Sequence, residues 1–225
     1  MKKLAHAMRK SSLLLGFYAL ISVLLVATVN FITRDQIIEN KRIMLQQKWN
    51  EVLDASRYSN DLNQHKKIIP AEISGFARDT DVYLAKAKDG TPIAAIFRVT
   101  TMQGYSGAIT LLVAVNYTDN HLTGVRVVEH KETPGLGDKI EVAKDDWIRD
   151  FKGKFLTDPD TKSWAVKRDG GDFDQFTGAT ITPRAIVSIV EDVLIYAHSN
   201  MQLLFSEPEM KLPVNTSREE DSANE

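Results

Sequence analysis

The sequence predicts an α+β protein in which an antiparallel sheet is flanked by helices and preceded by one N-terminal transmembrane helix. Three observations predict this class: an uncharged apolar stretch near the N-terminus, four strand-like segments joined by short turns, and an amphipathic helical pattern near the C-terminal end. A chain of 225 residues with 43% hydrophobic content is long enough for a membrane segment and one domain with its own core.

The membrane segment is predicted over residues 11–33. The first ten residues form a basic tail without an acidic side chain; its charged residues are Lys2, Lys3, Arg9 and Lys10. No further charge occurs before Arg34, so the uncharged stretch has about 23 residues and would be roughly 35 Å long as a helix, enough to span a bilayer. A secretory signal peptide has a shorter apolar core and a small-x-small cleavage site, which residues 27–30 fit poorly. We therefore expect an uncleaved anchor in membrane lipid.

The basic tail, residues 1–10, predicts an N-terminus in the cytoplasm and an exported remainder. Arg34, Lys41 and Arg42 beyond the span weaken this contrast, although acidic residues lie among them. The span itself holds no acidic or basic residue, so it is not expected to conduct ions by itself.

The chain after the anchor divides into three predicted parts. Residues 34–70 are expected to form a juxtamembrane helix, to about residue 56, and a polar connector that Pro70 closes. Residues 71–205 are expected to form the folded domain. Residues 206–225 are acidic and polar, which is typical of a disordered tail.

The domain begins with a predicted hairpin, because Val82–Lys88 and Ile93–Thr100 flank the turn sequence Asp89-Gly90. Two more strands follow around a turn at residues 118–121. Further predicted elements are strands at Ala108–Tyr117 and Leu122–His130, a short helix at Asp145–Phe151, and a strand at Ser163–Lys167. The short connections between the first four strands predict antiparallel pairing.

Composition excludes several classes of function. The chain has no cysteine, so it can form neither disulfides nor cysteine-ligated iron–sulfur clusters. Its five histidines show no metal-ligand spacing, and no metal site is predicted. A net charge of −2 and a pI near 6.2 give no electrostatic case for nucleic acid.

One short run near the C-terminal end, residues 174–180, precedes the amphipathic helix. Pro183 suits a first helical position and Thr182 suits a helix cap. Thr180 then lies just before a helix N-terminus, where unpaired N–H groups and the helix dipole favour a phosphate. From the residues alone, the run predicts either a phosphate site or ordinary helix capping.

A second run, Glu132-Thr133-Pro134-Gly135-Leu136-Gly137, combines a turn with two glycines that allow a flat ligand to approach the backbone. It lacks the spacing of a phosphate-binding P-loop and of a dinucleotide-binding fold. Taken alone, it favours a loop that binds nothing. A third run, Gly104-Tyr105-Ser106-Gly107, is not a hydrolase nucleophile elbow, because a strand follows it and its last glycine is displaced.

Two of these runs resemble the signatures of one flavoprotein family. Asp-x-x-Thr-Gly-Ala-Thr (residues 174–180) and Glu-Thr-Pro-Gly-Leu-Gly (residues 132–137) are similar to motifs of the FMN-binding domains in two related membrane redox complexes. These domains belong to the G subunit of the Rnf-type (Rsx) ion-translocating electron transport complex and the C subunit of the sodium-translocating NADH:quinone reductase. The resemblance extends from the anchor to the C-terminal helix.

The resemblance implies a covalently bound FMN, which a flavin transferase joins through its phosphate to Thr180 as a phosphoester. It also assigns residues to the site. The transferase would recognise the motif through Asp174, Gly178 and Thr180. The implied cofactor contacts are Thr177, Gly178, Ala179, Glu132, Thr133, Leu136 and Gly137.

The implied function is electron relay between partner subunits of an Rnf-type complex that couples ferredoxin–NAD electron flow to cation translocation. The chain would be a subunit without catalytic residues of its own, single-pass in a bacterial inner membrane, with its main domain in the periplasm. Two alternatives stay open: the C subunit of the quinone reductase, and a non-enzymatic anchored binding module in which residues 177–180 only cap a helix.

Overall fold

The computed structural model describes residues 2–157 and 163–206, and it divides into two units, Met1–Gln46 and Gln47–Glu225. The helix α1 (Lys2–Val52) provides the first unit and continues into the second. Between Ser12 and Val52 it has an 18-residue window of mean hydropathy 2.3, and its apolar side chains from Leu13 to Ile38 are exposed. In the described part of the chain it is the one helix long and apolar enough to cross a membrane. The predicted tail from residue 207 onward lies outside the described residues.

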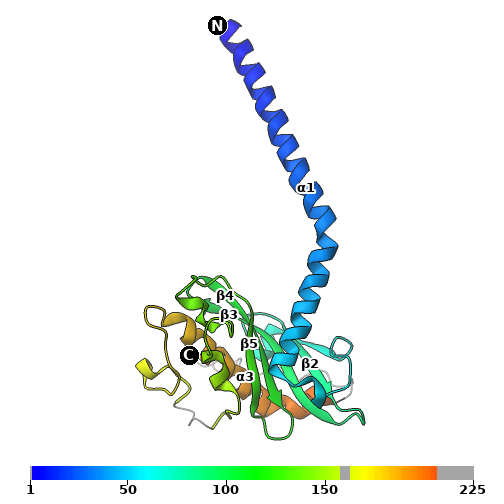
Figure 1. The fold of residues 1–225 in the computed structure, drawn as a ribbon, viewed down its shortest axis with the longest axis vertical. Coiled ribbons are helices and arrows are strands. Elements are labelled where there is room, and N and C mark those ends of the chain that lie inside the picture. Colours follow the sequence, from blue (N-terminus) through cyan, green and yellow to red (C-terminus); the bar gives the residue numbers. More distant parts are fainter. Residues whose placement is uncertain (1, 158–162, 207–225) are drawn as a thin grey trace, which may run out of the picture. The chain divides into compact units, whose positions relative to one another are not determined.

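A five-stranded antiparallel sheet forms the centre of the second unit, with strand order β1-β2-β3-β4-β5 (Figure 1). The strands are β1 (Lys66–Ile69), β2 (Thr80–Lys86), β3 (Pro92–Gly104), β4 (Gly107–Asn116) and β5 (Leu122–Glu129). The other described elements are α2 (Ala71–Ser74), α3 (Ile181–Phe205), and short 3₁₀ helices at Ala55–Arg57, Gly137–Ile140, Trp147–Phe151 and Lys167–Asp169.

One face of the sheet packs against α3, which runs behind the strands in Figure 1. Strand alternation places Ala95, Phe97 and Val99 of β3 on this face, where they join the apolar side of α3 in the core. Phe97 meets Tyr196 of α3 edge to face, with ring centroids 6.2 Å apart. The fully buried residues of α3 therefore hold the helix in place along the sheet.

The last turns of α1 cover part of the opposite face. Trp49 packs on Tyr83 of β2 with ring centroids 4.8 Å apart. The buried hydroxyl of Thr123 donates to the carbonyl oxygen of Val52 at 2.8 Å. Gly124 allows this close approach, because a Cβ there would lie 2.8 Å from the Cα of Val52. With both faces covered, β4 is buried along most of its length.

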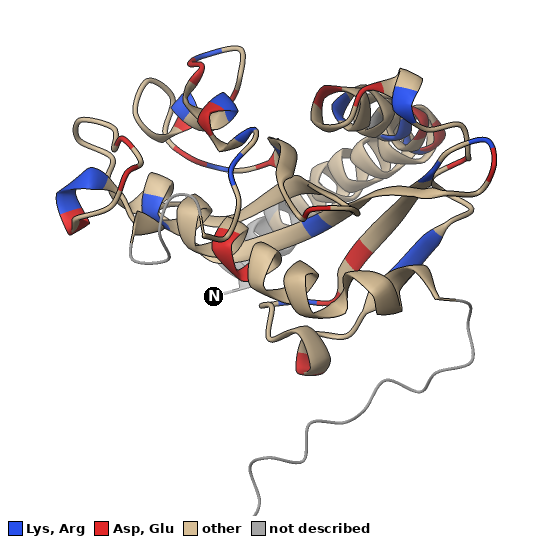
Figure 2. Cartoon of the chain, turned by 90° about the horizontal axis from the view of Figure 1, so that it is seen from below, with Lys and Arg blue, Asp and Glu red and all other residues tan. Residues whose placement is uncertain are grey.

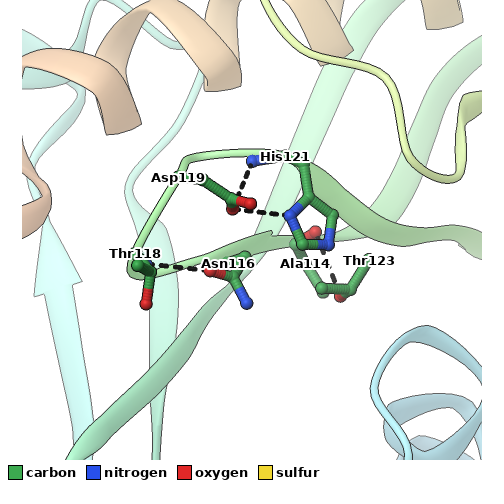
Figure 3. A network of polar contacts seen from close by, with 6 residues as sticks. All are labelled: Ala114, Asn116, Thr118, Asp119, His121 and Thr123. Carbon is green, nitrogen blue, oxygen red and sulfur yellow. Dashed lines mark hydrogen bonds and ion pairs between the residues drawn. The ribbon is translucent and has the colours of Figure 1, made fainter.

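The turn between β4 and β5 is the predicted one and is fastened by its own side chains (Figure 3). Asn116 Oδ1 accepts the N–H of Thr118 at 2.8 Å, and Asp119 Oδ1 accepts the N–H of His121 at 3.3 Å. Asn120 adopts a φ of 60°, a left-handed conformation that asparagine tolerates better than most residues. The turn thus sets the register in which Val113 pairs with Val125.

The predicted hairpin at Asp89-Gly90, the four predicted strands (β2 to β5) and the C-terminal helix are confirmed. The polar connector is a wrong prediction at its end, because β1 forms there as an edge strand. Lysines such as Lys66 and Lys67 suit an edge strand. Such a strand pairs through its backbone with one neighbour, here β2, and its side chains can stay exposed to solvent. The strand predicted at Ser163–Lys167 is also wrong: Val166 makes only an isolated bridge to Phe173. The juxtamembrane helix ends at Val52, before the predicted residue 56.

Charged residues are spread over the described domain, with basic and acidic positions interspersed along its loops and strands (Figure 2). The sheet carries one charged cluster, in which Asp81 lies 3.2 Å from Lys66 Nζ and 3.7 Å from Arg98 Nη1. Such partly exposed pairs contribute little to stability and serve mainly to make this part of the face polar.

The environment of Tyr83 predicts that the domain loses stability at alkaline pH. Burial, followed by the nearby Asp81 carboxylate, raises the pKa of Tyr83 to about 12 from a usual 10.0. An unfolded tyrosine releases its proton near pH 10, so between pH 10 and 12 the unfolded state binds fewer protons and stability falls as pH rises. Tyr83→Phe is therefore expected to lose part of this decline, measured as the thermal midpoint of both proteins from pH 8 to pH 12. Parallel declines in the two proteins would contradict the assignment.

Candidate functional site

A cavity of about 380 Å³ lies where three segments of the domain meet. These segments are the turn between β3 and β4, the loop after β5, and the start of α3. Seven of the predicted site residues line it: Glu132, Thr133, Leu136, Gly137, Gly178, Ala179 and Thr180. The other lining residues are Tyr105, Ile181 and Thr182.

The strand order explains why these distant segments meet. Because β3, β4 and β5 form an antiparallel meander, the end of β5 lies beside the start of β4, and Thr110 pairs with Glu129. The residues after β5 therefore emerge next to the turn at Gly104–Gly107. The N-terminal end of α3 reaches the same place.

Glu132 connects the three segments. Its side chain is 4% exposed, and each carboxylate oxygen accepts a hydrogen bond from a different segment. Oε1 accepts the backbone N–H of Ser106 at 2.9 Å, and Oε2 accepts the hydroxyl of Thr182 at 2.5 Å. The backbone N–H of Glu132 itself donates to Nδ1 of His130 at 3.0 Å. The loop after β5 is thus fixed on the hairpin turn and on the helix.

Two glycines make room for this carboxylate. A Cβ on Gly137 would lie 2.7 Å from Oε2 of Glu132 and 3.0 Å from Oγ1 of Thr182. A Cβ on Gly104 would lie 2.9 Å from Oε1 of Glu132. Neither glycine has a positive φ, so both positions require a small residue for close packing. At Gly137 the nearest atom is Glu132 Oε2, whereas at Gly104 the carbonyl oxygen of Gly107 and Cδ1 of Ile109 are even closer than Glu132.

The helix α3 begins at Ile181, which makes Thr180 its N-cap residue. Thr182 was predicted to be the cap and Pro183 the first helical residue; both predictions are wrong by two positions. The side chain of Thr180 makes no capping hydrogen bond, and the residue lines the cavity. The first N–H groups of a helix have no partner within it, so this wall combines a hydroxyl with donors suited to a phosphate.

The rest of the cavity wall is apolar and open. Tyr105 is 70% exposed, Leu136 45% and Ile181 46%, although each carries a large apolar side chain. Gly178 has a φ of 80° and exposes its backbone to the cavity. A Cβ at this position would have Leu136 as its nearest neighbour, at 3.7 Å. A flat, partly apolar ligand would cover these surfaces and gain from their removal from water.

The two remaining predicted residues, Asp174 and Thr177, lie outside this cavity. They line a neighbouring hollow of about 350 Å³ together with Trp147 and three aspartates of the segment 145–150. Trp147 fixes the run in place: its indole N–H donates to the carbonyl oxygen of Asp174 at 2.8 Å, and its ring meets Phe176 at 5.1 Å. The side chain of Asp174 pairs with Lys167 Nζ at 2.6 Å.

An ion pair joins the start of α3 to the loop before the run. Arg184 donates to both carboxylate oxygens of Asp169. The hydrogen bond from Arg184 lowers the pKa of Asp169 and raises that of Arg184. Both groups are in contact with solvent, so the pair orients the loop and adds little free energy.

Sequence reasoning missed three cavity residues: Tyr105, Ile181 and Thr182. Tyr105 was visible in the run Gly104–Gly107 but received no role there. Ile181 looks like one more apolar residue of an amphipathic helix, and its exposure depends on where the helix begins. The contact of Thr182 with Glu132 joins residues 50 positions apart, and no local pattern signals it.

Comparison with known proteins identifies relatives of the chain. Two family models match it: the RnfG N-terminal region over residues 1–52 and the FMN-binding domain over residues 104–195. The G subunit of the ion-translocating oxidoreductase complex of Escherichia coli K12 is 46% identical over 191 residues, covering 85% of this chain and 91% of that protein. The protein of the same name from Vibrio atlanticus is 40% identical over 203 residues, covering 90% and 96%.

The chain belongs to the family of G subunits of ion-translocating oxidoreductase complexes. The crystal structure of Shewanella oneidensis NqrC is similar to this chain with a TM-score of 0.43 and 24% sequence identity. The aligned part covers 67% of this chain and 73% of that chain. This overlap is too low to carry a functional argument. The G-subunit relatives and the apolar helix α1 together make the chain a membrane-anchored protein with an FMN-binding domain.

The packing around Gly137 yields a prediction. In Gly137→Ala the new methyl group would collide with Glu132 and Thr182, so we expect a loss of about 1–3 kcal/mol in unfolding free energy. Denaturant unfolding measures this loss. Equal stability of the Gly137→Ala variant and the natural protein would show that Glu132 is not held as described.

Proposed function

We propose that this chain relays electrons within an ion-translocating oxidoreductase complex through an FMN joined by a phosphoester to Thr180. The single observation that carries the proposal is the position of Thr180. Thr180 makes no side-chain capping hydrogen bond, although it occupies the N-cap position of a 25-residue helix, and it lines the cavity that the 132–137 loop also lines. A threonine with an unused hydroxyl at such a place is suited to carry a phosphate ester.

The wall residues fit the two ends of FMN. The free N–H groups at the start of α3 suit the phosphate, and the exposed side chains of Tyr105, Leu136 and Ile181 suit the flat isoalloxazine. Gly178 and Ala179 would leave room for the chain between them, while Thr133 and Gly137 offer backbone at the ring. Asp174, Gly178 and Thr180 are assigned to recognition of the motif by a flavin transferase. Thr177 stays a proposed cofactor contact, although it lines the neighbouring hollow.

A bound flavin supplies one- and two-electron redox chemistry, and the protein's residues supply its binding and orientation. The chain has no cysteine to ligate an iron–sulfur cluster, so electrons must come from other subunits and pass on to them. The names and identities of its relatives favour the Rnf-type G subunit over the C subunit of the sodium-translocating quinone reductase. Coupling of ferredoxin–NAD electron flow to cation translocation would then be the activity of the whole complex.

Attachment at Thr180 predicts a fluorescent protein band. Full-length chain co-expressed with the flavin transferase should fluoresce under ultraviolet light after denaturing electrophoresis, and Thr180→Ala should abolish the band because no other hydroxyl replaces the ester. Thr91→Ala, which changes an exposed threonine of the turn between β2 and β3, is the control and should keep it. A band that persists in Thr180→Ala would refute this attachment site. A natural protein without any band would favour the alternative of an anchored module without flavin.

We further propose that the N-terminus is cytoplasmic and the domain from residue 47 onward is periplasmic, in a bacterial inner membrane. The argument is the basic tail of residues 1–10 before an uncharged span. Alkaline phosphatase, which folds only after export, should be active when fused to the C-terminus, and a fusion after residue 10 should be inactive. Inactive enzyme at the C-terminus, with the fusion protein present in normal amount, would reverse the orientation.

A further inference from the structure

We propose that Glu132 and Thr182 form a positioning pair that holds the Thr180 hydroxyl in the geometry needed for flavin attachment. This inference rests on the proposed attachment of FMN to Thr180. Neither residue is proposed to react: each acts through the first turn of α3. Glu132 begins the run 132–137, whereas Thr182 lies outside both sequence runs, so neither run predicts the pairing.

The contacts join the pair directly to the reacting residue. Thr182 is fully buried, and its hydroxyl donates to Oε2 of Glu132 at 2.5 Å. Thr182 lies two residues after Thr180 in the same helical turn, and the carbonyl oxygen of Thr180 accepts the N–H of Arg184 at 3.3 Å. A shift of Thr182 away from Glu132 would therefore move Thr180 and the free N–H groups beside it.

The opposite end of Glu132 is fixed as well. Its Oε1 accepts the N–H of Ser106, and Gly104 and Gly137 close around the carboxylate. The hairpin turn, which is part of the sheet, thus holds the carboxylate, and the carboxylate holds the helix turn. Both walls of the cavity are set by one side chain.

Stability alone is a poor reason for this arrangement. In the described part of the chain, no lysine or arginine forms an ion pair with Glu132, and burying a carboxylate is costly even when it is hydrogen-bonded. Apolar residues of similar size would fill the space at lower cost. A directional hydrogen bond, by contrast, fixes the orientation of a helix turn in a way that apolar contacts do not.

The chain provides a matched control for the pair. Thr123 is another buried threonine, and its hydroxyl donates to the carbonyl oxygens of Val52 and Ala114 (Figure 3 shows the bond to Ala114). It lies at the start of β5 and lines no part of the cavity. Thr182→Val and Thr123→Val therefore remove the same group from two buried sites, only one of which adjoins Thr180.

The test compares initial rates of covalent flavin attachment to full-length chains by the purified transferase, well below each thermal midpoint, with a flavin dinucleotide as donor. The Thr180 hydroxyl loses its proton and forms the new P–O bond to the FMN phosphate, while the pyrophosphate bond of the donor breaks and a nucleoside monophosphate leaves. Thr182→Val is expected to lower the turnover rate by about tenfold to a hundredfold, because misplacement of a reacting group by about 1 Å has effects of that size. The KM for the acceptor chain should stay unchanged. Thr123→Val should lose similar stability and attach flavin within about twofold of the natural rate. Thr182→Ser, which keeps the hydroxyl, should restore the rate.

Glu132→Gln tests the other partner. Its amide oxygen can accept the N–H of Ser106, and its amide nitrogen can donate to Thr182, so this variant should attach flavin far faster than Glu132→Ala. Natural turnover in Thr182→Val, or an equal loss in Thr123→Val, would overturn the positioning pair. Those outcomes would leave the proposed function intact. The proposed function fails only if the natural chain does not bind flavin covalently, or if the Thr180→Ala variant still does.

Discussion

One buried carboxylate joins the parts of this protein that make up its site. Glu132 accepts a hydrogen bond from a turn 26 residues before it and another from a helix 50 residues after it. Carboxylate oxygens accept and do not donate, so each bond fixes the direction of the group that approaches it. The cavity wall, the start of α3 and the hairpin turn consequently form one rigid assembly around a single side chain.

The sheet makes that assembly possible. Its meander brings the end of β5 beside the turn at Gly104–Gly107, and α3 packs along one face with its N-terminal end at the same place. The end of α1, with Trp49 and Val52, and the following residue Leu53 cover part of the other face. The helix that carries the membrane segment therefore ends within the core of the domain.

The sequence was informative where the signal is local. Turn residues at Asp89-Gly90, apolar alternation in the strands and the periodicity of α3 predicted the fold, and two short runs predicted seven of the cavity residues. It failed where tertiary contacts decide. Thr182 followed by Pro183 has the composition of a cap, yet the bond to Glu132 draws Thr182 into the helix and leaves Thr180 at the cap position. The edge strand β1 was missed because its two lysines make the segment look like a polar connector. An edge strand forms through backbone hydrogen bonds and does not require an apolar pattern.

The central claim, a flavin held covalently by the hydroxyl of residue 180, is tested most directly on protein matured in its own cell. Tandem mass spectrometry of the peptide that contains Thr177, Thr180 and Thr182 would locate any added mass on one of the three threonines. The account predicts the mass of FMN less one water on Thr180, with the other two threonines unmodified. An unmodified Thr180 in mature protein, or a flavin on either neighbour, would contradict it.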